Sequence, residues 1–135
     1  MRGGMSARGE RTGRAADNAA VVSEDGVNFG PLTAYAGDDA EAARGILESF
    51  AEQSAANCRL LERALESGDV AALRAVAHKM LPIFTMLGAA GVAATLRTAE
   101  SWEGPLTDAL RGEIGAAAEN IRAIVAEAQK KVSLP

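Results

Sequence analysis

The sequence predicts an all-α protein, an antiparallel up-down-up-down four-helix bundle with a short N-terminal helix and a flexible N-terminal arm. Hydrophobic residues make up 48% of the chain but aromatic residues only 4%, a composition that favours closely packed helices over a sheet. In four long segments, apolar residues recur at every third or fourth position. Connections of about two to four residues join these segments, so an up-down bundle covers their apolar stripes most simply.

The first 29 residues differ from the rest of the chain. They are rich in Gly, Arg, Ser and Asp and show no sustained period, so we expect residues 1–29 to form a flexible arm or linker and residues 30–135 the bundle. Four arginines and one glutamate lie within the first 14 residues, leaving 10 basic and 17 acidic residues, a net charge of −7, in the remainder. This excess of acidic over basic residues should repel nucleic acid.

The chain also lacks two signals for membranes and secretion. No stretch approaches the roughly 20 apolar residues of a membrane span, and the start of the chain has no apolar centre of a secretory signal. A single cysteine, Cys58, fits a reducing compartment. We therefore expect no membrane insertion and a cytoplasmic location.

The helices follow in order from these patterns. A short helical entry is expected over residues 31–35, and Asp38 and Asp39 can then accept hydrogen bonds from the first amides of a long helix that ends near residue 66. Gly68 should end this helix and Asp69 cap the next. The buried stripe of the first long helix is expected to comprise Leu47, Phe50, Ser54, Cys58, Leu61 and Leu65.

Three more helices are expected over residues 70–87, 89–102 and 106–131, with Gly88 ending the first of them. Cys58 continues a buried stripe, so we interpret it as a small core residue. With one cysteine and one histidine, the chain offers no plausible zinc or haem ligand set, and we expect no metal site. Tyr35 and Trp102 lie near element ends, where large rings commonly close a bundle core.

The only histidine, His78, falls in the second long helix but off its apolar stripe. At roughly 100° per residue, His78 lies about 140° from Leu73, the centre of that stripe. The imidazole should therefore face solvent. An unperturbed imidazole is substantially neutral and nucleophilic near pH 7, so this position suits transfer chemistry with another macromolecule.

The sequence around His78 contains a spaced motif. The Ala77-His78 pair is followed, ten and eleven residues after the histidine, by Gly88-Ala89. The features that accompany this motif are Gly37-Asp38-Asp39, Phe50, Leu61, Ala64, Gly68-Asp69, Leu73, Leu96 and Glu100. Together these residues resemble the pattern typical of the histidine-containing phosphotransfer (HPt) domain family, and the similarity covers roughly residues 32–131.

The resemblance implies reversible phosphoryl transfer between His78 and an aspartate of a response-regulator receiver domain in a two-component phosphorelay. The chain would then be a phosphoryl carrier without an ATP-binding domain, not an autonomous kinase, and we expect it to be a monomer. The receiver, which can belong to a hybrid sensor kinase, would supply the magnesium ion and a lysine, so this chain needs no cofactor of its own.

Two positions depart from the family pattern. The family usually has lysine three residues and glycine four residues after the histidine, where this chain has Leu81 and Pro82. The amide missing at Pro82 cannot bond to the His78 carbonyl, and the proline ring should bend the helix. These departures keep an alternative open, in which the chain is a non-phosphorylated HPt-like adaptor that binds a receiver or kinase without transfer.

Replacement contacts for the phosphate or the partner are therefore expected elsewhere on the same helix. Arg74 lies about 40° from His78 around the helix and Lys79 about 100°, which favours Arg74 for direct phosphate contact. Leu81, Pro82 and Thr85 form a neighbouring patch that could dock a partner. The Thr85 hydroxyl can hydrogen-bond the imidazole, a phosphate or its own helix.

Overall fold

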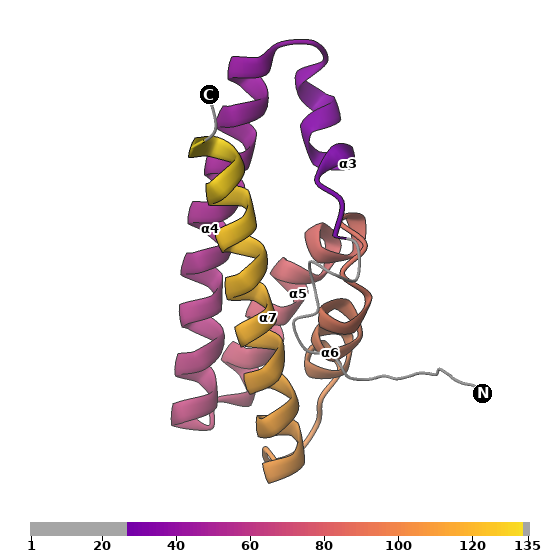
Figure 1. Cartoon of the computed structure of the whole chain (residues 1–135). Coiled ribbons are helices and arrows are strands. Elements are labelled where there is room, and N and C mark those ends of the chain that lie inside the picture. Colours follow the sequence, from indigo (N-terminus) through magenta and orange to yellow (C-terminus); the bar gives the residue numbers. More distant parts are fainter. Residues whose placement is uncertain (1–26, 134–135) are drawn as a thin grey trace, which may run out of the picture.

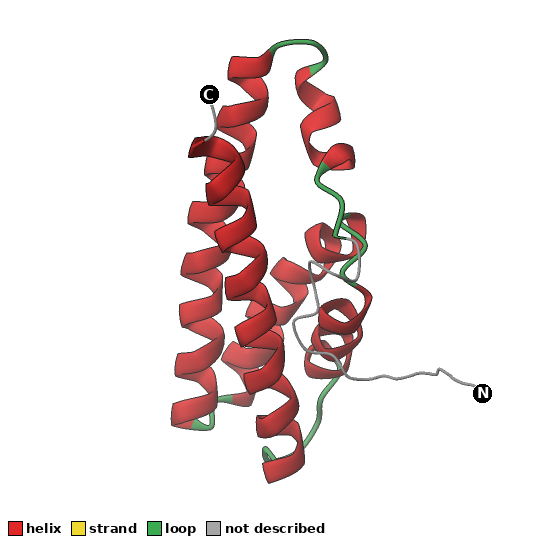
Figure 2. Ribbon diagram, in the orientation of Figure 1, coloured by secondary structure: helices red, strands yellow, loops and turns green. Residues whose placement is uncertain are grey.

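The computed structural model describes residues 27–133, and within this range every regular element is a helix (Figures 1 and 2). The all-α class is therefore confirmed. A short helix α3 (Gly30–Thr33) and a 3₁₀ turn η1 (Ala34–Ala36) occupy the expected helical entry. Four longer helices follow: α4 (Ala40–Ser67), α5 (Val70–Met86), α6 (Ala90–Glu100) and α7 (Asp108–Ser133).

The long helices pack through four principal pairings. The two longest, α4 and α7, lie side by side and run in opposite directions (Figure 1). Helix α5 packs against α4 and α6, and α6 also packs against α7. Each long helix therefore buries its apolar stripe against two neighbours.

The core contains the stripes expected from the sequence. Five of the six residues predicted for α4 are buried, and the sixth, Leu65, is partly buried against the core. The Phe50 ring on α4 contacts the Phe84 ring on α5, with 5.9 Å between the centroids. The largest fully buried side chains are Phe84, Leu61, Leu73, Met80, Leu87, Leu96, Ile114, Ile121, Ile124 and Val92.

Packed structure begins before the boundary expected at residue 30. Phe29 is only 7% exposed, and its ring meets Phe50 edge-on at 5.8 Å between centroids. The amide of Asn28 donates to the Leu87 carbonyl at 3.0 Å. An aromatic ring of this size gains more from burial than from water, so Phe29 joins the core. Residues 1–26 of the expected arm lie outside the described residues.

The expected caps form where the sequence predicts them. The side chain of Asp39 accepts the amide of Ala42 at 3.0 Å, and that of Asp69 accepts the amide of Ala72 at the same distance. Gly68 has a φ of +70°, a left-handed conformation that glycine adopts without a side-chain clash. The tight connection between α4 and α5 is therefore encoded locally.

Two helices differ from the expected bounds. Helix α6 begins at Ala90 and ends at Glu100, so it is shorter than residues 89–102. Helix α7 begins after Thr107, whose hydroxyl accepts the Leu110 amide at 3.1 Å and so caps the helix. The spacing of apolar residues alone cannot locate the ends of a helix, because capping hydrogen bonds of this kind determine where the helix begins.

The two aromatic residues expected to close the core behave differently. Trp102 is partly buried against the core, and its Nε1 donates to the Pro105 carbonyl at 3.1 Å. The expectation for Tyr35 is wrong, because this side chain is 80% exposed. It belongs to the turn η1, in which no residue is buried.

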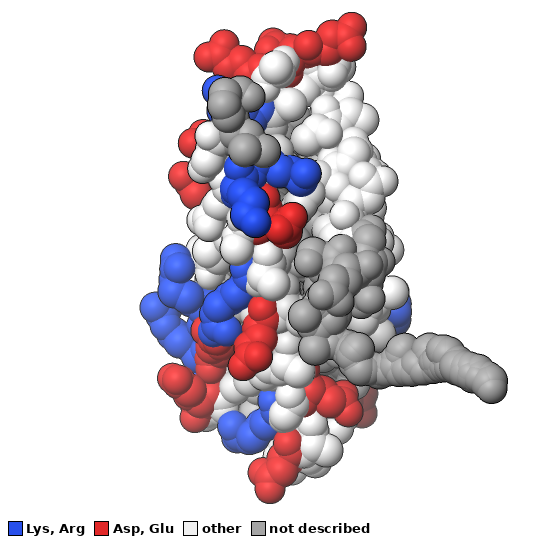
Figure 3. Space-filling model, in the orientation of Figure 1, with Lys and Arg blue, Asp and Glu red and all other residues white. Residues whose placement is uncertain are grey.

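Acidic side chains gather at the end of the molecule where η1 turns into α4 (Figure 3). The turn and the first residues of α4 supply Asp38, Asp39 and Glu41, and these carboxylates suit the positive end of the α4 dipole.

Among the helices of residues 27–133, none is long and apolar enough to cross a membrane.

Two adjacent leucines on α4 test the assignment of the core. Leu61 is fully buried, whereas Leu60 is 43% exposed. We expect Leu61→Ala to lower the free energy of unfolding by about 2–5 kcal/mol, because it leaves a cavity between packed helices. The matched variant Leu60→Ala should cost less than about 1 kcal/mol. Urea denaturation followed by circular dichroism measures both, and equal losses would contradict this packing.

Candidate functional site

His78 projects from α5 into solvent, as the helical periodicity predicts. The stripe of α5 that contains Leu73, Ala77 and Met80 is buried. Because His78 lies on another side of the helix, its side chain is 76% exposed. The imidazole is therefore accessible to a second macromolecule.

The ring of His78 is held by a carboxylate from the neighbouring helix. His78 Nδ1 hydrogen-bonds Glu100 Oε2, and the Glu100 side chain is 31% exposed. Glu100 is the last residue of α6, which packs against α5. The contact therefore depends on the packing of these two helices.

This contact decides which ring nitrogen can react. An ionised carboxylate has only hydrogen-bond acceptors, so a neutral imidazole must donate its proton from Nδ1 to Glu100. The Nε2 atom of His78 then carries the lone pair. The His78 ring therefore presents Nε2 as an exposed nucleophilic nitrogen, and the hydrogen bond between Nδ1 and Glu100 fixes the orientation of the ring.

Arg74 lies beside this pair, on the side of the helix that the sequence predicts. Its Nε donates to the Glu100 carbonyl oxygen at 3.3 Å. Arg74, Ala75, His78 and Glu100 together line an open hollow of about 300 Å³. A guanidinium has five N–H donors and the bond to Glu100 uses one, so the remaining donors can serve an anion in the hollow.

Lys79 and Thr85 line other hollows of the surface. Lys79 faces a groove between α4 and α5 that Leu60 and Arg63 also line. Thr85 is exposed near the turn between α5 and α6 and shares a hollow with Arg97. Neither residue lines the His78 hollow, so among the basic candidates Arg74 is the one placed beside the imidazole.

The two departures from the family pattern also differ in environment. Leu81 is partly buried against the core, whereas Pro82 is exposed. Helix α5 continues through Pro82 to Met86, although proline offers no amide to the His78 carbonyl. The bend expected at Pro82 stays a prediction.

Glu100 is the site residue that the sequence reasoning noted only as a family feature. The position of Glu100 could have been predicted from the connection between α5 and α6, where Gly88 adopts a φ of +77°. Two helices that reverse direction at a tight turn bring together residues at similar distances from that turn. His78 and Glu100 lie ten and twelve residues from Gly88, so their contact could be found in this way.

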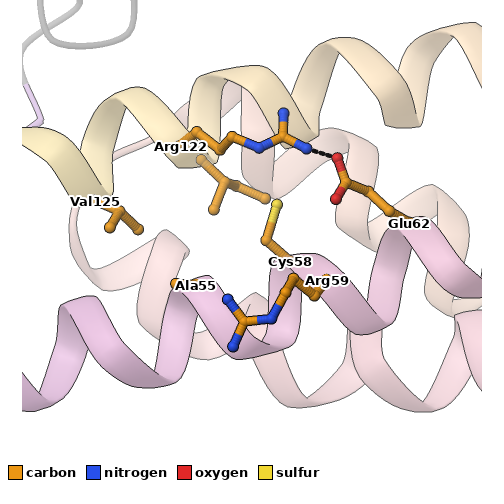
Figure 4. A pocket seen from close by; sticks show the side chains of 7 residues that line it. Ala55, Cys58, Arg59, Glu62, Arg122 and Val125 are labelled. Atoms are coloured by element: carbon orange, nitrogen blue, oxygen red, sulfur yellow. Dashed lines mark ion pairs between the residues drawn. The ribbon is translucent and has the colours of Figure 1, made fainter.

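The thiol of Cys58, a second candidate nucleophile, lies in the core. Cys58 points from α4 toward α7 (Figure 4). Its thiol lies 3.6 Å from the Ala118 carbonyl oxygen. Burial raises the pKa of the Cys58 thiol, while the charges of Arg122 and Arg59 act in the opposite direction. A buried thiol with a raised pKa is a poor nucleophile, so Cys58 acts as the small core residue that the sequence predicts.

The Cys58 environment can be tested with a thiol reagent. In the folded protein we expect 5,5′-dithiobis(2-nitrobenzoate) to react with Cys58 at least about 100-fold more slowly than in urea, because the side chain is almost completely buried and burial raises the pKa of its thiol. Absorbance at the released thiolate measures the rate. Comparable rates in native and unfolded protein would contradict the buried position.

The tautomer of His78 tests the Glu100 contact. In the wild type above pH 8 we expect the proton mainly on Nδ1, whereas Glu100→Ala should move it mainly to Nε2 because the acceptor is lost. Long-range ¹H–¹⁵N correlation spectra distinguish the two tautomers. The control Glu103→Ala removes an exposed carboxylate three residues further on and should leave the spectrum unchanged. An Nε2-protonated wild type would exclude the inferred geometry.

Within residues 27–133, no group of three or more His, Cys, Asp or Glu side chains is arranged to hold a metal ion. Comparison of the chain with protein-family models, with curated proteins and with solved structures gives no match. The function of this chain must therefore be inferred from the chemistry of its own residues.

Proposed function

We propose that this chain is a histidine phosphotransfer carrier, which exchanges a phosphoryl group between His78 and receiver-domain aspartates in a two-component phosphorelay. The observation that carries the proposal is the exposed imidazole whose Nδ1 hydrogen-bonds Glu100, leaving Nε2 available to react. The sequence resemblance of residues 32–131 to the HPt family points to the same chemistry.

The finer fold is part of the same proposal. We assign the four long helices to an up-down-up-down bundle of the HPt type. In support, α4 and α7 run in opposite directions, and each long helix packs principally against two others. Short connections that contain Gly68 and Gly88 favour antiparallel neighbours.

The reaction is a transfer between two covalent carriers. The lone pair of His78 Nε2 attacks the phosphorus of the receiver's aspartyl phosphate in line, and a nitrogen–phosphorus bond forms. The bond from phosphorus to the aspartate oxygen breaks, and the carboxylate leaves with the electron pair. The Nδ1 proton stays on the ring, where the Glu100 carboxylate offsets the positive charge that the ring acquires. The reverse steps pass the phosphoryl group to a second receiver.

Arg74 is the residue best placed to stabilise the transferred group. It lines the same hollow as His78, and a guanidinium can donate two parallel hydrogen bonds to phosphate oxygens. Leu81 stands where the family usually has lysine, so we assign charge neutralisation to Arg74, together with the lysine and magnesium ion expected of the receiver.

The proposal is tested by mixing the protein with a ³²P-labelled phosphorylated receiver. We expect label that is stable to base and labile to acid on the wild type and none on His78→Gln. Arg74→Ala should slow the transfer by about tenfold or more, because it removes the basic side chain that lines the His78 hollow. The variant Lys130→Ala, which removes an exposed cation on α7, is the control and should transfer normally.

The adaptor alternative gives the opposite result. A non-phosphorylated HPt-like adaptor would bind the receiver equally well with His78 or with Gln at this position, and it would carry no phosphohistidine. Binding measured by titration calorimetry, alongside the labelling assay, separates the two functions. A receiver that binds tightly but never labels the wild type would contradict phosphotransfer.

A further inference from the structure

A pocket of about 280 Å³ lies between α4 and α7, the two longest helices. The residues that line it are Ala55, Cys58, Arg59 and Glu62 on α4 and Ile121, Arg122 and Val125 on α7. None of them lines the His78 hollow. We call this space the α4–α7 pocket, and the phosphotransfer proposed above gives it no role.

The inner surface of the α4–α7 pocket is apolar. Ile121 and Val125 are buried on α7, and Ala55 is partly buried against the core on α4. Ala55 carries only a methyl group, the smallest of the side chains that line the pocket, so it leaves room between the two helices. A hydrocarbon group that entered the pocket would therefore leave water for a preformed apolar surface.

Two guanidinium groups border this apolar surface. In Figure 4 the guanidinium of Arg59 lies toward Ala55. The guanidinium of Arg122 lies toward the other end of the pocket, where it pairs with Glu62. Burial raises the pKa of the Cys58 thiol, and the charges of Arg122 and Arg59 oppose this rise. Both positive charges therefore act at the inner surface of the pocket.

The charges of the pocket leave one cation without a partner. Arg122 is paired with Glu62, whereas Arg59 makes no hydrogen bond or ion pair within the described part of the chain. Two arginines and one glutamate give the pocket a net charge of +1. A monoanion would balance this charge. A dianion such as phosphate would bring an uncompensated negative charge close to Glu62 and to an apolar surface, which is unfavourable.

The chemistry of the border and the size of the pocket narrow the class of ligand further. A planar guanidinium can donate two parallel hydrogen bonds to a carboxylate. A dry apolar cavity of roughly 150 Å³ holds one benzene molecule. The α4–α7 pocket, at about 280 Å³, therefore has room for a single ring or a chain of about six carbons together with a carboxylate group.

We propose that the α4–α7 pocket binds a small apolar monocarboxylate, with its hydrocarbon group against Ile121 and Val125 and its carboxylate on Arg59. Aromatic acids and short-chain fatty acids share this chemistry. The site is separate from His78, so the proposal goes beyond phosphotransfer and does not rest on it.

Titrations followed by ¹H–¹⁵N correlation spectra test the site. We expect sodium benzoate or sodium hexanoate to bind with a dissociation constant of about 1 mM or tighter. The largest shifts should fall in residues 55–62 and 121–125. Benzamide, the neutral analogue of benzoate, and acetate, which lacks the hydrocarbon group, should each bind at least about tenfold more weakly. The tighter of the two acids shows whether the natural ligand carries a ring or a chain.

Three variants locate the binding. Arg59→Gln removes the unpaired charge and should weaken binding of the tighter acid about tenfold or more. The matched control Arg63→Gln removes an exposed arginine of α4 that does not line the pocket and should leave the affinity unchanged. Ala55→Leu fills the pocket and should abolish binding. Circular dichroism of each variant verifies that the helices remain folded, and the two arginine variants decide the result if Ala55→Leu does not fold.

Several outcomes would overturn the proposal. It is wrong if neither acid shifts the spectrum at about 10 mM, or if benzamide or acetate binds as tightly as the preferred acid. Equal affinities of Arg59→Gln and Arg63→Gln would also exclude it. These titrations use the unphosphorylated protein and no receiver, so their result is independent of the phosphotransfer assay.

Discussion

The apolar stripe of α5 packs against α4 and α6, and this contact sets the direction of every other side chain on the helix. Because Leu73, Ala77 and Met80 lie in the core, His78 points into solvent. Arg74 lies on one side of His78 around the helix, and Lys79 lies on the other side. The same packing brings the end of α6 to the imidazole, so Glu100 reaches Nδ1. A buried stripe and one interhelical hydrogen bond thus define an exposed nucleophile with a fixed orientation.

The site separates two tasks between residues that lie close together. Glu100 positions the ring and determines its tautomer, and Arg74 provides cationic donors in the hollow where a phosphoryl group would sit. In our proposal the chain holds the phosphoryl group, and the receiver brings the magnesium ion.

The sequence was most informative where structure depends on local rules. Periodicity predicted the buried stripes and the exposure of His78, and the Gly68-Asp69 pair predicted the connection between α4 and α5. It was least informative where distant segments meet. The burial of Phe29 depends on its contact with the Phe50 ring on α4, and no apolar periodicity in the residues before Phe29 predicts it. The hydrogen bond from His78 to Glu100 likewise requires the packing of α5 on α6. Tyr35 lies near an element end, but that position in the sequence did not show that its side chain is exposed.

We infer that the hydrogen bond from Nδ1 to Glu100 leaves His78 Nε2 free to react, and the position of the phosphoryl group on the ring tests this most directly. The ¹⁵N-labelled protein can be phosphorylated with potassium phosphoramidate, and long-range ¹H–¹⁵N correlations with ³¹P coupling then identify the substituted nitrogen. We expect the phosphoryl group on Nε2, with the proton retained on Nδ1 against Glu100. Phosphorylation of Nδ1, or no phosphohistidine at position 78, would contradict this account.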